Sequence, residues 1–103
     1  MHEYHIRQLV DEFPPLDSGK QSTVLADDQR VKIILFRFAA GTGLAEHVAP
    51  CSALIQIIHG EARLTVGHES FLASPGTWVQ MVAQTPHSVQ AATPLMLVLT
   101  LLK

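Results

Sequence analysis

Two histidines stand in short segments whose residue types could carry chemistry. His47 ends the segment Gly41-Thr-Gly-Leu-Ala-Glu-His, and His87 lies forty residues later, in Thr85-Pro-His-Ser. An imidazole changes its protonation state near neutral pH and is also the commonest protein ligand for transition metals. The two histidines therefore predict hydrogen-bonding and acid–base chemistry, or metal binding, if the fold brings them together.

The elements that must position these histidines are β-strands. After residue 20, short runs rich in Val, Ile, Leu and Phe alternate with turn residues such as Gly60, Gly67 and Pro94. No window there has a convincing helical period, and many short strands at this spacing are typical of an all-β sandwich or barrel. We predict nine strands, at residues 21–26, 31–39, 44–48, 53–58, 62–66, 70–73, 78–82, 88–91 and 95–102.

The first twenty residues differ from the rest of the chain. They are polar, and Pro14, Pro15 and Gly19 break any long helix, which leaves one short turn between residues 6 and 13. The chain of 103 residues has room for one small domain. We predict an irregular N-terminal segment at 1–20 and a single barrel domain at 21–103.

Composition excludes several functional classes. The formal net charge is −2 and the seven Lys and Arg residues are scattered, so we expect no nucleic-acid partner. The longest apolar run, residues 95–102, is too short to span a bilayer, and no signal-like apolar core begins the chain. The one cysteine, Cys51, allows no internal disulfide and fits a reducing compartment. We therefore expect a cytoplasmic protein without a membrane partner.

Two predicted strands are apolar on both faces. Only Gln56 is polar in residues 53–58, and only Thr100 is polar in residues 95–102. A half-exposed antiparallel strand should alternate between apolar and polar residues, so something must cover the outer face. The cover is either a second subunit or residues 1–20 folded over the barrel, and we expect a homodimer.

The pattern around the two histidines resembles the two conserved motifs of the cupin family. Gly41 and Gly60 match the glycines that open and close the first motif, and Ser74-Pro-Gly76 matches the turn that begins the second. The resemblance covers residues 31–102. It implies an all-β fold, a double-stranded β-helix (jelly-roll) barrel.

The resemblance also implies a degenerate metal site. Cupins hold Fe, Mn, Ni, Co or Zn with a His-x-His pair, a glutamate and a histidine from the second motif. His47 and His87 match two of these ligands, whereas Ala49 and Ala53 replace the others. Alternate residues of a strand share a face, so positions 47, 49 and 53 should all face into the barrel. Two imidazoles hold a divalent ion poorly, so we expect no metal or a weakly held one.

Cys51 would add a soft third ligand if its side chain also faced inward. The alternative is a small buried apolar residue, which is the common fate of a free cysteine. Gln84 lies in the loop that leads to His87, where it would either hydrogen-bond a ligand or be an ordinary surface residue. Four further residues are expected to line the pocket or to form plain core: Phe38, Ile57, Met81 and Trp78.

Three functions fit these observations. The first is a small-molecule binding module that needs little or no metal, in which His47 and His87 anchor the polar end of an organic ligand. The second is a metal-dependent enzyme, of the dioxygenase, isomerase or decarboxylase type, acting on a small organic acid or phenol. The third is a structural or regulatory dimer with a vestigial pocket. No Asp or Glu occurs between Glu46 and Glu61, which disfavours acid–base catalysis and favours the binding module.

Overall fold

The computed structural model describes residues 4–103, and residues 1–3 of the predicted N-terminal segment lie outside the described residues. Nearly all regular structure in residues 4–103 is β, as the sequence predicts. The elements are α1 (Leu9–Glu12), β1 (Lys20–Asp27), β2 (Val31–Phe38), β3 (Gly43–His47), β4 (Ser52–His59), β5 (Ala62–Val66), β6 (Glu69–Ala73), β7 (Trp78–Met81), β8 (His87–Ala91) and β9 (Leu95–Leu102).

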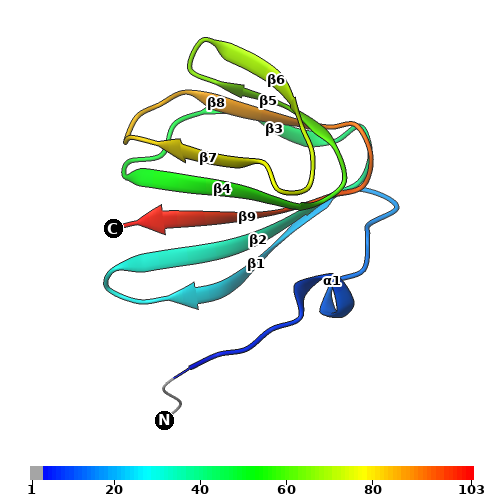
Figure 1. The fold of residues 1–103 in the computed structure, drawn as a ribbon, viewed down its shortest axis with the longest axis horizontal. Helices are drawn as coiled ribbons and strands as arrows, with labels where there is room; N and C mark the ends of the chain where they lie inside the picture. The colour runs from blue at the N-terminus through cyan, green and yellow to red at the C-terminus, as the bar shows by residue number, and fades with distance from the viewer. Residues whose placement is uncertain (1–3) are drawn as a thin grey trace.

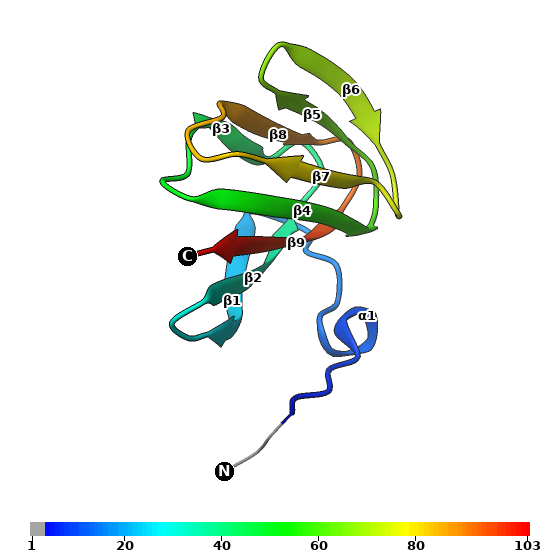
Figure 2. The same cartoon turned by 60° about the vertical axis from the view of Figure 1, so that its left-hand side comes forward.

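The nine strands form two antiparallel sheets that face each other. One sheet has the order β1-β2-β9-β4-β7 and the other has the order β3-β8-β5-β6. Figure 1 shows the smaller sheet above the larger one, and Figure 2 shows the same two layers after rotation. Chain neighbours often lie in different sheets, so that β3 and β8, far apart in the sequence, pair directly. The predicted jelly-roll class and all nine predicted strands are confirmed.

The core lies between the two sheets and follows from strand alternation. Ala53, Ile55 and Ile57 are at most 3% exposed and point inward from β4. They meet Leu64 and Val89 from the opposite sheet, which belong to the same buried cluster. The intervening residue Gln56 is exposed. The period of two along the strand therefore selects which face joins the core.

The outer face of the larger sheet carries the second apolar side of strands β4 and β9. The register places Arg37, Val31 and Met96 on this face, opposite in alternation to the core residues, together with a further eleven uncharged residues. We call these eleven residues the outer patch: Thr23, Ile33, Leu35, Ser52, Leu54, Gln56, Trp78, Gln80, Val98, Thr100 and Leu102. Leu35 is buried within the chain, but Trp78 is 59% and Leu102 is 38% exposed.

The N-terminal segment covers only one end of that sheet. The Phe13 ring lies under the guanidinium groups of Arg7 and Arg37, whose Cζ atoms are 5.4 and 5.3 Å from its centroid. Nη1 of Arg37 also donates a hydrogen bond to the Pro14 carbonyl oxygen, at 2.8 Å. Figure 2 shows the segment running away from the barrel beyond α1. Trp78 and Leu102 of the outer patch stay exposed.

The helix α1 lies inside the stretch where one short helical turn was predicted, and β1 begins at Lys20. The division into a segment at 1–20 and a domain at 21–103 stays a prediction. No helix within residues 4–103 is long and apolar enough to cross a membrane.

Candidate functional site

The fold brings the two predicted histidines into contact. His47 is the last residue of β3 and His87 is the first residue of β8, and the register places them directly opposite each other. Their ring centroids are 4.2 Å apart and the ring planes are inclined by 57°. A pair of residues forty positions apart in the chain therefore forms one polar cluster.

A β-bulge aims His47 at its partner. Leu44 pairs with Val89 and His47 pairs with His87, so two residues of β3 lie opposite the single residue Ser88. The extra residue lets Leu44 pack against the core while His47, three positions later, still meets the buried His87. Bulges commonly re-aim side chains in this way beside functional sites.

Both rings are held in the same tautomer. Nδ1 of His47 lies 2.8 Å from the Ala45 carbonyl oxygen, and Nδ1 of His87 lies 2.9 Å from the Thr85 carbonyl oxygen. A carbonyl oxygen only accepts hydrogen bonds, so each Nδ1 must carry the proton. In the neutral rings both Nε2 atoms then keep their lone pairs. The site thus presents two hydrogen-bond acceptors, or two potential metal donors, on rings whose centroids are 4.2 Å apart.

The two histidines differ in burial. His87 is 4% exposed, whereas His47 is exposed at the end of its strand. Within residues 4–103, no fully enclosed polar side-chain atom lacks a hydrogen-bond partner. Nε2 of His87 has no such partner among these residues, so it must border open space at the end of the barrel. The pair therefore spans from the core to solvent.

Nothing among the described residues completes a metal site around this pair. No group of three or more His, Cys, Asp or Glu side chains within residues 4–103 lies close enough to hold one ion. Half-buried Cys51 does not form a group of three close side chains with His47 and His87, and its role as a ligand stays a prediction. Ala53, at one of the lost ligand positions, is 1% exposed in the core. A metal here would depend on ligands from solution, because open metal sites usually have three protein ligands.

The other predicted pocket residues are distributed over the barrel. Met81 is 3% exposed and pairs with Ala53, at the same end as the histidines. Phe38 and Ile57 are enclosed in the core, so they are core residues and not an exposed pocket wall. Trp78 does not line the barrel: it pairs with exposed Gln56 and lies on the outer patch. Its prediction as a lining residue was wrong because β7 places Met81 and Val79 inward instead.

Gln84 adopts the left-handed backbone conformation, with φ of 70°, and no other non-glycine residue among residues 4–103 has a positive φ. Its N–H donates a hydrogen bond to the Ala49 carbonyl oxygen at 2.9 Å, which ties the loop before His87 to the loop after His47. The side chain is exposed. Gln84 thus borders the site, and its role as a ligand contact stays a prediction.

The strained backbone at Gln84 gives a stability prediction. Gln84→Gly should raise the free energy of unfolding by about 0.5–1 kcal/mol, because glycine adopts a positive φ without steric cost. Urea denaturation measures the change. The matched control is Gln80→Gly in β7, also an exposed glutamine, which should instead lower stability because glycine weakens a strand. A loss of stability in Gln84→Gly would contradict this interpretation.

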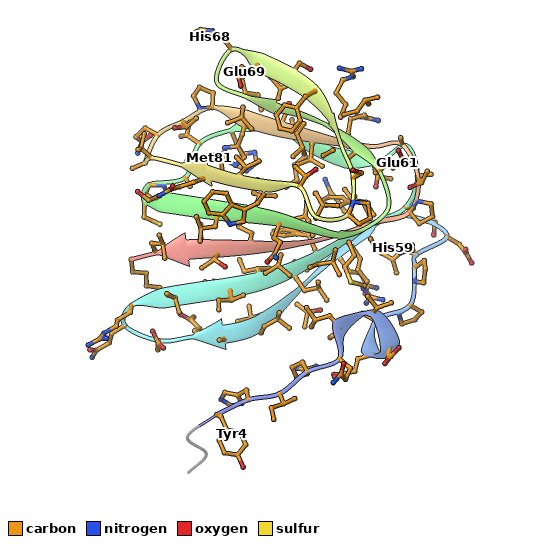
Figure 3. The ribbon with its side chains drawn as sticks, viewed as in Figure 1. Tyr4, His59, Glu61, His68, Glu69 and Met81 are labelled. Carbon is orange, nitrogen blue, oxygen red and sulfur yellow. The ribbon has the colours of Figure 1, made fainter. Side chains whose placement is uncertain are left out.

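The remaining polar and apolar features lie away from the histidine pair. Figure 3 shows His68 at the tip of the β5–β6 hairpin and His59 beside α1. A pocket of about 30 Å³, lined in part by Phe13, Arg37 and His59, lies between the N-terminal segment and the barrel. It has room for only one or two water molecules. Arg37 already donates to Pro14 and Gln21, so this pocket offers little to a ligand.

The sequence reasoning missed the charged residues that the register places on the inner face, among them Lys32 and its neighbour Asp27. Lys32 has the same alternation as Phe36 and Phe38 in β2, and its side chain is half-buried. The period of two in this predicted strand was a sufficient signal to place it on the inner face.

Known structures share this architecture. A cupin superfamily protein from Desulfitobacterium hafniense has a TM-score of 0.85 and 24% identity, over 99% of this chain and 93% of that chain. An RmlC-like cupin from Desulfovibrio desulfuricans has a TM-score of 0.86 and 22% identity, over 97% of each chain. This chain has the cupin fold. The DMSP lyase DddQ from Ruegeria pomeroyi is similar too, with a TM-score of 0.75 and 20% identity, over 82% of this chain and 47% of that chain.

The expected resemblance to cupins is thereby confirmed at the level of the fold. The sequence matches no protein-family model and none of the curated proteins with which it was compared. Within the cupin barrel, the opening and closing glycines of the first motif, Gly41 and Gly60, both have φ of 84°. Gly76, in the Ser-Pro-Gly turn, has φ of 97°. The glycine skeleton that carried the resemblance therefore has a conformational cause.

Proposed function

We propose that this cupin binds a small organic molecule that carries a hydroxyl or acid group, with His47 and His87 as its polar anchors. The observation that carries the proposal is the common tautomer of the pair, which turns two Nε2 lone pairs into neighbouring acceptors. A ligand O–H would donate to one of them. A stronger acid would transfer its proton and leave an ion pair.

The surroundings favour a ligand whose body is apolar. Met81 and Ala53 occupy the facing sheet at this end of the barrel, and Val66 flanks His87 on β5. Small-molecule sites typically combine such an apolar wall with a few fixed polar groups. No carboxylate shares the histidine pair within residues 4–103, which supports binding more than acid–base catalysis.

Nuclear magnetic resonance of ¹⁵N-labelled imidazoles tests the proposal, with phenol and benzene as probes. We expect phenol to shift the Nε2 resonance of His87 and benzene to bind at least about tenfold more weakly, since a hydrogen bond to a ring nitrogen is lost. His87→Ala and His47→Ala should each weaken phenol binding by about tenfold. If His87→Ala fails to fold, His47→Ala still tests the proposal, because His47 is exposed and its truncation leaves the core intact.

The matched control is His68→Ala, which removes an exposed imidazole from the β5–β6 turn. It should bind phenol like the wild type. Unchanged affinity for phenol in a folded His47→Ala protein, or equal affinity of the wild type for phenol and benzene, would refute the role of the pair as polar anchor.

A metal-dependent enzyme is the second candidate, and one observation favours it. Metal-binding histidines usually donate the other ring N–H to a carbonyl or carboxylate, as both histidines do here. The DMSP lyase among the similar structures shows that the fold can carry an enzyme. The two-imidazole donor set does not fit a tightly held ion, so we expect substoichiometric Fe, Mn, Ni, Co or Zn after desalting. Elemental analysis that finds one retained ion per chain would favour the enzyme.

We further propose that the chain forms a homodimer through the outer patch. Its members carry no formal charge, and charged residues are depleted at the cores of protein interfaces. A second copy presents the same uncharged surface, so a two-fold axis would set the patch against itself. The N-terminal segment limits the patch at the Arg37 end of the sheet, which leaves Leu54, Val98 and Trp78 available.

A further inference from the structure

Lys32 lies on the inner face of the larger sheet, in a row of residues that crosses the barrel. The register pairs Lys32 with Leu101, Leu101 with Ala53, and Ala53 with Met81. Leu101 packs against the core, and Ala53 and Met81 belong to it. Directly opposed residues in neighbouring strands share a face, so Lys32 belongs to the inner face too.

This row lies at the same end of the barrel as the histidine pair. His47 is joined to Ala53 by the short loop 48–51, and Met81 is joined to His87 by the loop 82–86. Figures 1 and 2 both show the end of β9, the tip of β7 and the β1–β2 turn at one end of the molecule. Lys32 is two strands from Ala53, or about 10 Å at ordinary strand spacing.

The ammonium group of Lys32 is not used by the fold. The ion pairs within residues 4–103 are Arg7–Glu12 and Lys103–Asp27, the latter at 2.6 Å. Asp27 lies opposite Lys32 in the β1–β2 ladder, yet its carboxylate is taken by Lys103. The hydrogen bond from Lys103 is the main cause that lowers the pKa of Asp27, and the charge of Lys32 adds a smaller effect.

Charged residues lie on both sides of this end of the barrel, and the Asp27 carboxylate opposite Lys32 is bound by Lys103. In the smaller sheet the row from His87 continues through Val66 to Glu69, which is exposed on the edge strand β6. The inner face of the larger sheet has Lys32 at its β2 side instead. An anionic group on a ligand would therefore be attracted to Lys32 and repelled from the Glu69 side.

We infer that Lys32 is a specificity-determining residue and that the ligand class is hydroxy carboxylic acids. The inference rests on the proposed function: the hydroxyl lies at the His47–His87 pair, and the carboxylate lies against the Lys32 ammonium. The Lys32 ammonium binds a carboxylate through a charge-assisted hydrogen bond, which is stronger than the bond it makes to a neutral amide. The body between the two groups packs on Leu101, the apolar member of the row that is only partly buried.

Two isosteric probes test this inference, 4-hydroxybenzoate and 4-hydroxybenzamide, which share the hydroxyl and differ in charge. Isothermal titration calorimetry should show that the wild type prefers the carboxylate by about tenfold or more. Lys32→Met should abolish that preference and leave the affinity for the amide unchanged. Lys32→Arg should restore it. The matched control is Arg63→Met, which removes one positive charge from the exposed face of β5.

The outcomes separate the two proposals. Equal affinity of the wild type for the two probes, with loss of both in His47→Ala, would overturn the role of Lys32 and leave the anchoring role of the histidines intact. A preference for the carboxylate that falls equally in Lys32→Met and Arg63→Met would also overturn it, because net charge alone would explain the effect. No binding of either probe to the wild type would overturn both proposals.

Discussion

Gly43→Ala should destabilise this protein by about 3 kcal/mol or more, which is at the upper end of what overpacking costs. Gly43 begins β3 and pairs with Gln90 of β8. A Cβ atom added there would lie 1.9 Å from the Val89 carbonyl oxygen and 3.1 Å from the Gln90 Cα. Both obstacles are backbone atoms of a paired strand, so no side-chain rotation relieves the overlap and β3 must move away from β8.

That movement would also reach the candidate site. His47 lies four residues after Gly43 on the same short strand, and its contact with His87 depends on the β3–β8 ladder. Lys20 donates a hydrogen bond from Nζ to the Gly43 carbonyl oxygen at 2.8 Å, so its anchor would be disturbed too. In a domain of this size, 3 kcal/mol corresponds to a fall in Tm of roughly 12–24 °C. Calorimetry measures that fall, and the imidazole resonances report whether the pair separates.

Gly67→Ala is the matched control, because it isolates the conformational cost from the steric one. Gly67 has φ of 59° and no atom lies within 4 Å of a Cβ added there. An alanine in that conformation should cost only about 1–2 kcal/mol. Equal losses of stability in the two variants would show that β3 yields easily, and would contradict the close packing of β3 on β8.

Strand alternation and turn residues made most of the fold predictable from the sequence. Each predicted strand ends near a glycine, a proline or a charged turn, and every observed boundary coincides with the predicted one or differs from it by one residue. The histidine pair required more than alternation. Its two members belong to strands that are remote in sequence, so only the resemblance to a known motif pair suggested that His47 and His87 would meet.

The positions of Trp78, Cys51 and Lys32 have physical causes that a single strand does not reveal. Trp78 is large and apolar, so hydrophobicity placed it inside, but Met81 and Val79 occupy the inner face of β7. Cys51 lies between two strands, beside Pro50, where the alternation that would have aimed its sulfur inward does not apply. Lys32 was considered only as one of the scattered positive charges, and its place in the strand alternation was not used. Its neighbours in the register place it on the inner face instead.

Val98→Glu should convert the proposed dimer into a monomer. Val98 lies on β9, the central strand of the larger sheet, and pairs with Leu35 on one side and Gln56 on the other. A carboxylate at this point would be buried against an uncharged copy of the same patch. The two-fold axis would bring two such charges near each other. A loss of 3–5 kcal/mol, typical of an uncompensated buried charge, corresponds to a dissociation constant raised by a factor of about 150 to 4,000.

Sedimentation velocity at micromolar concentration distinguishes the two states. The wild type should sediment as a dimer and Val98→Glu as a monomer, with an unchanged circular dichroism spectrum. Trp78→Ala, which truncates a side chain that is 59% exposed, should weaken the dimer without placing a charge in the sheet. The matched control is Leu72→Glu, because Leu72 is 68% exposed on the outer face of β6 in the other sheet. A monomeric wild type, or a dimer lost only in Leu72→Glu, would show that the outer patch is not the interface.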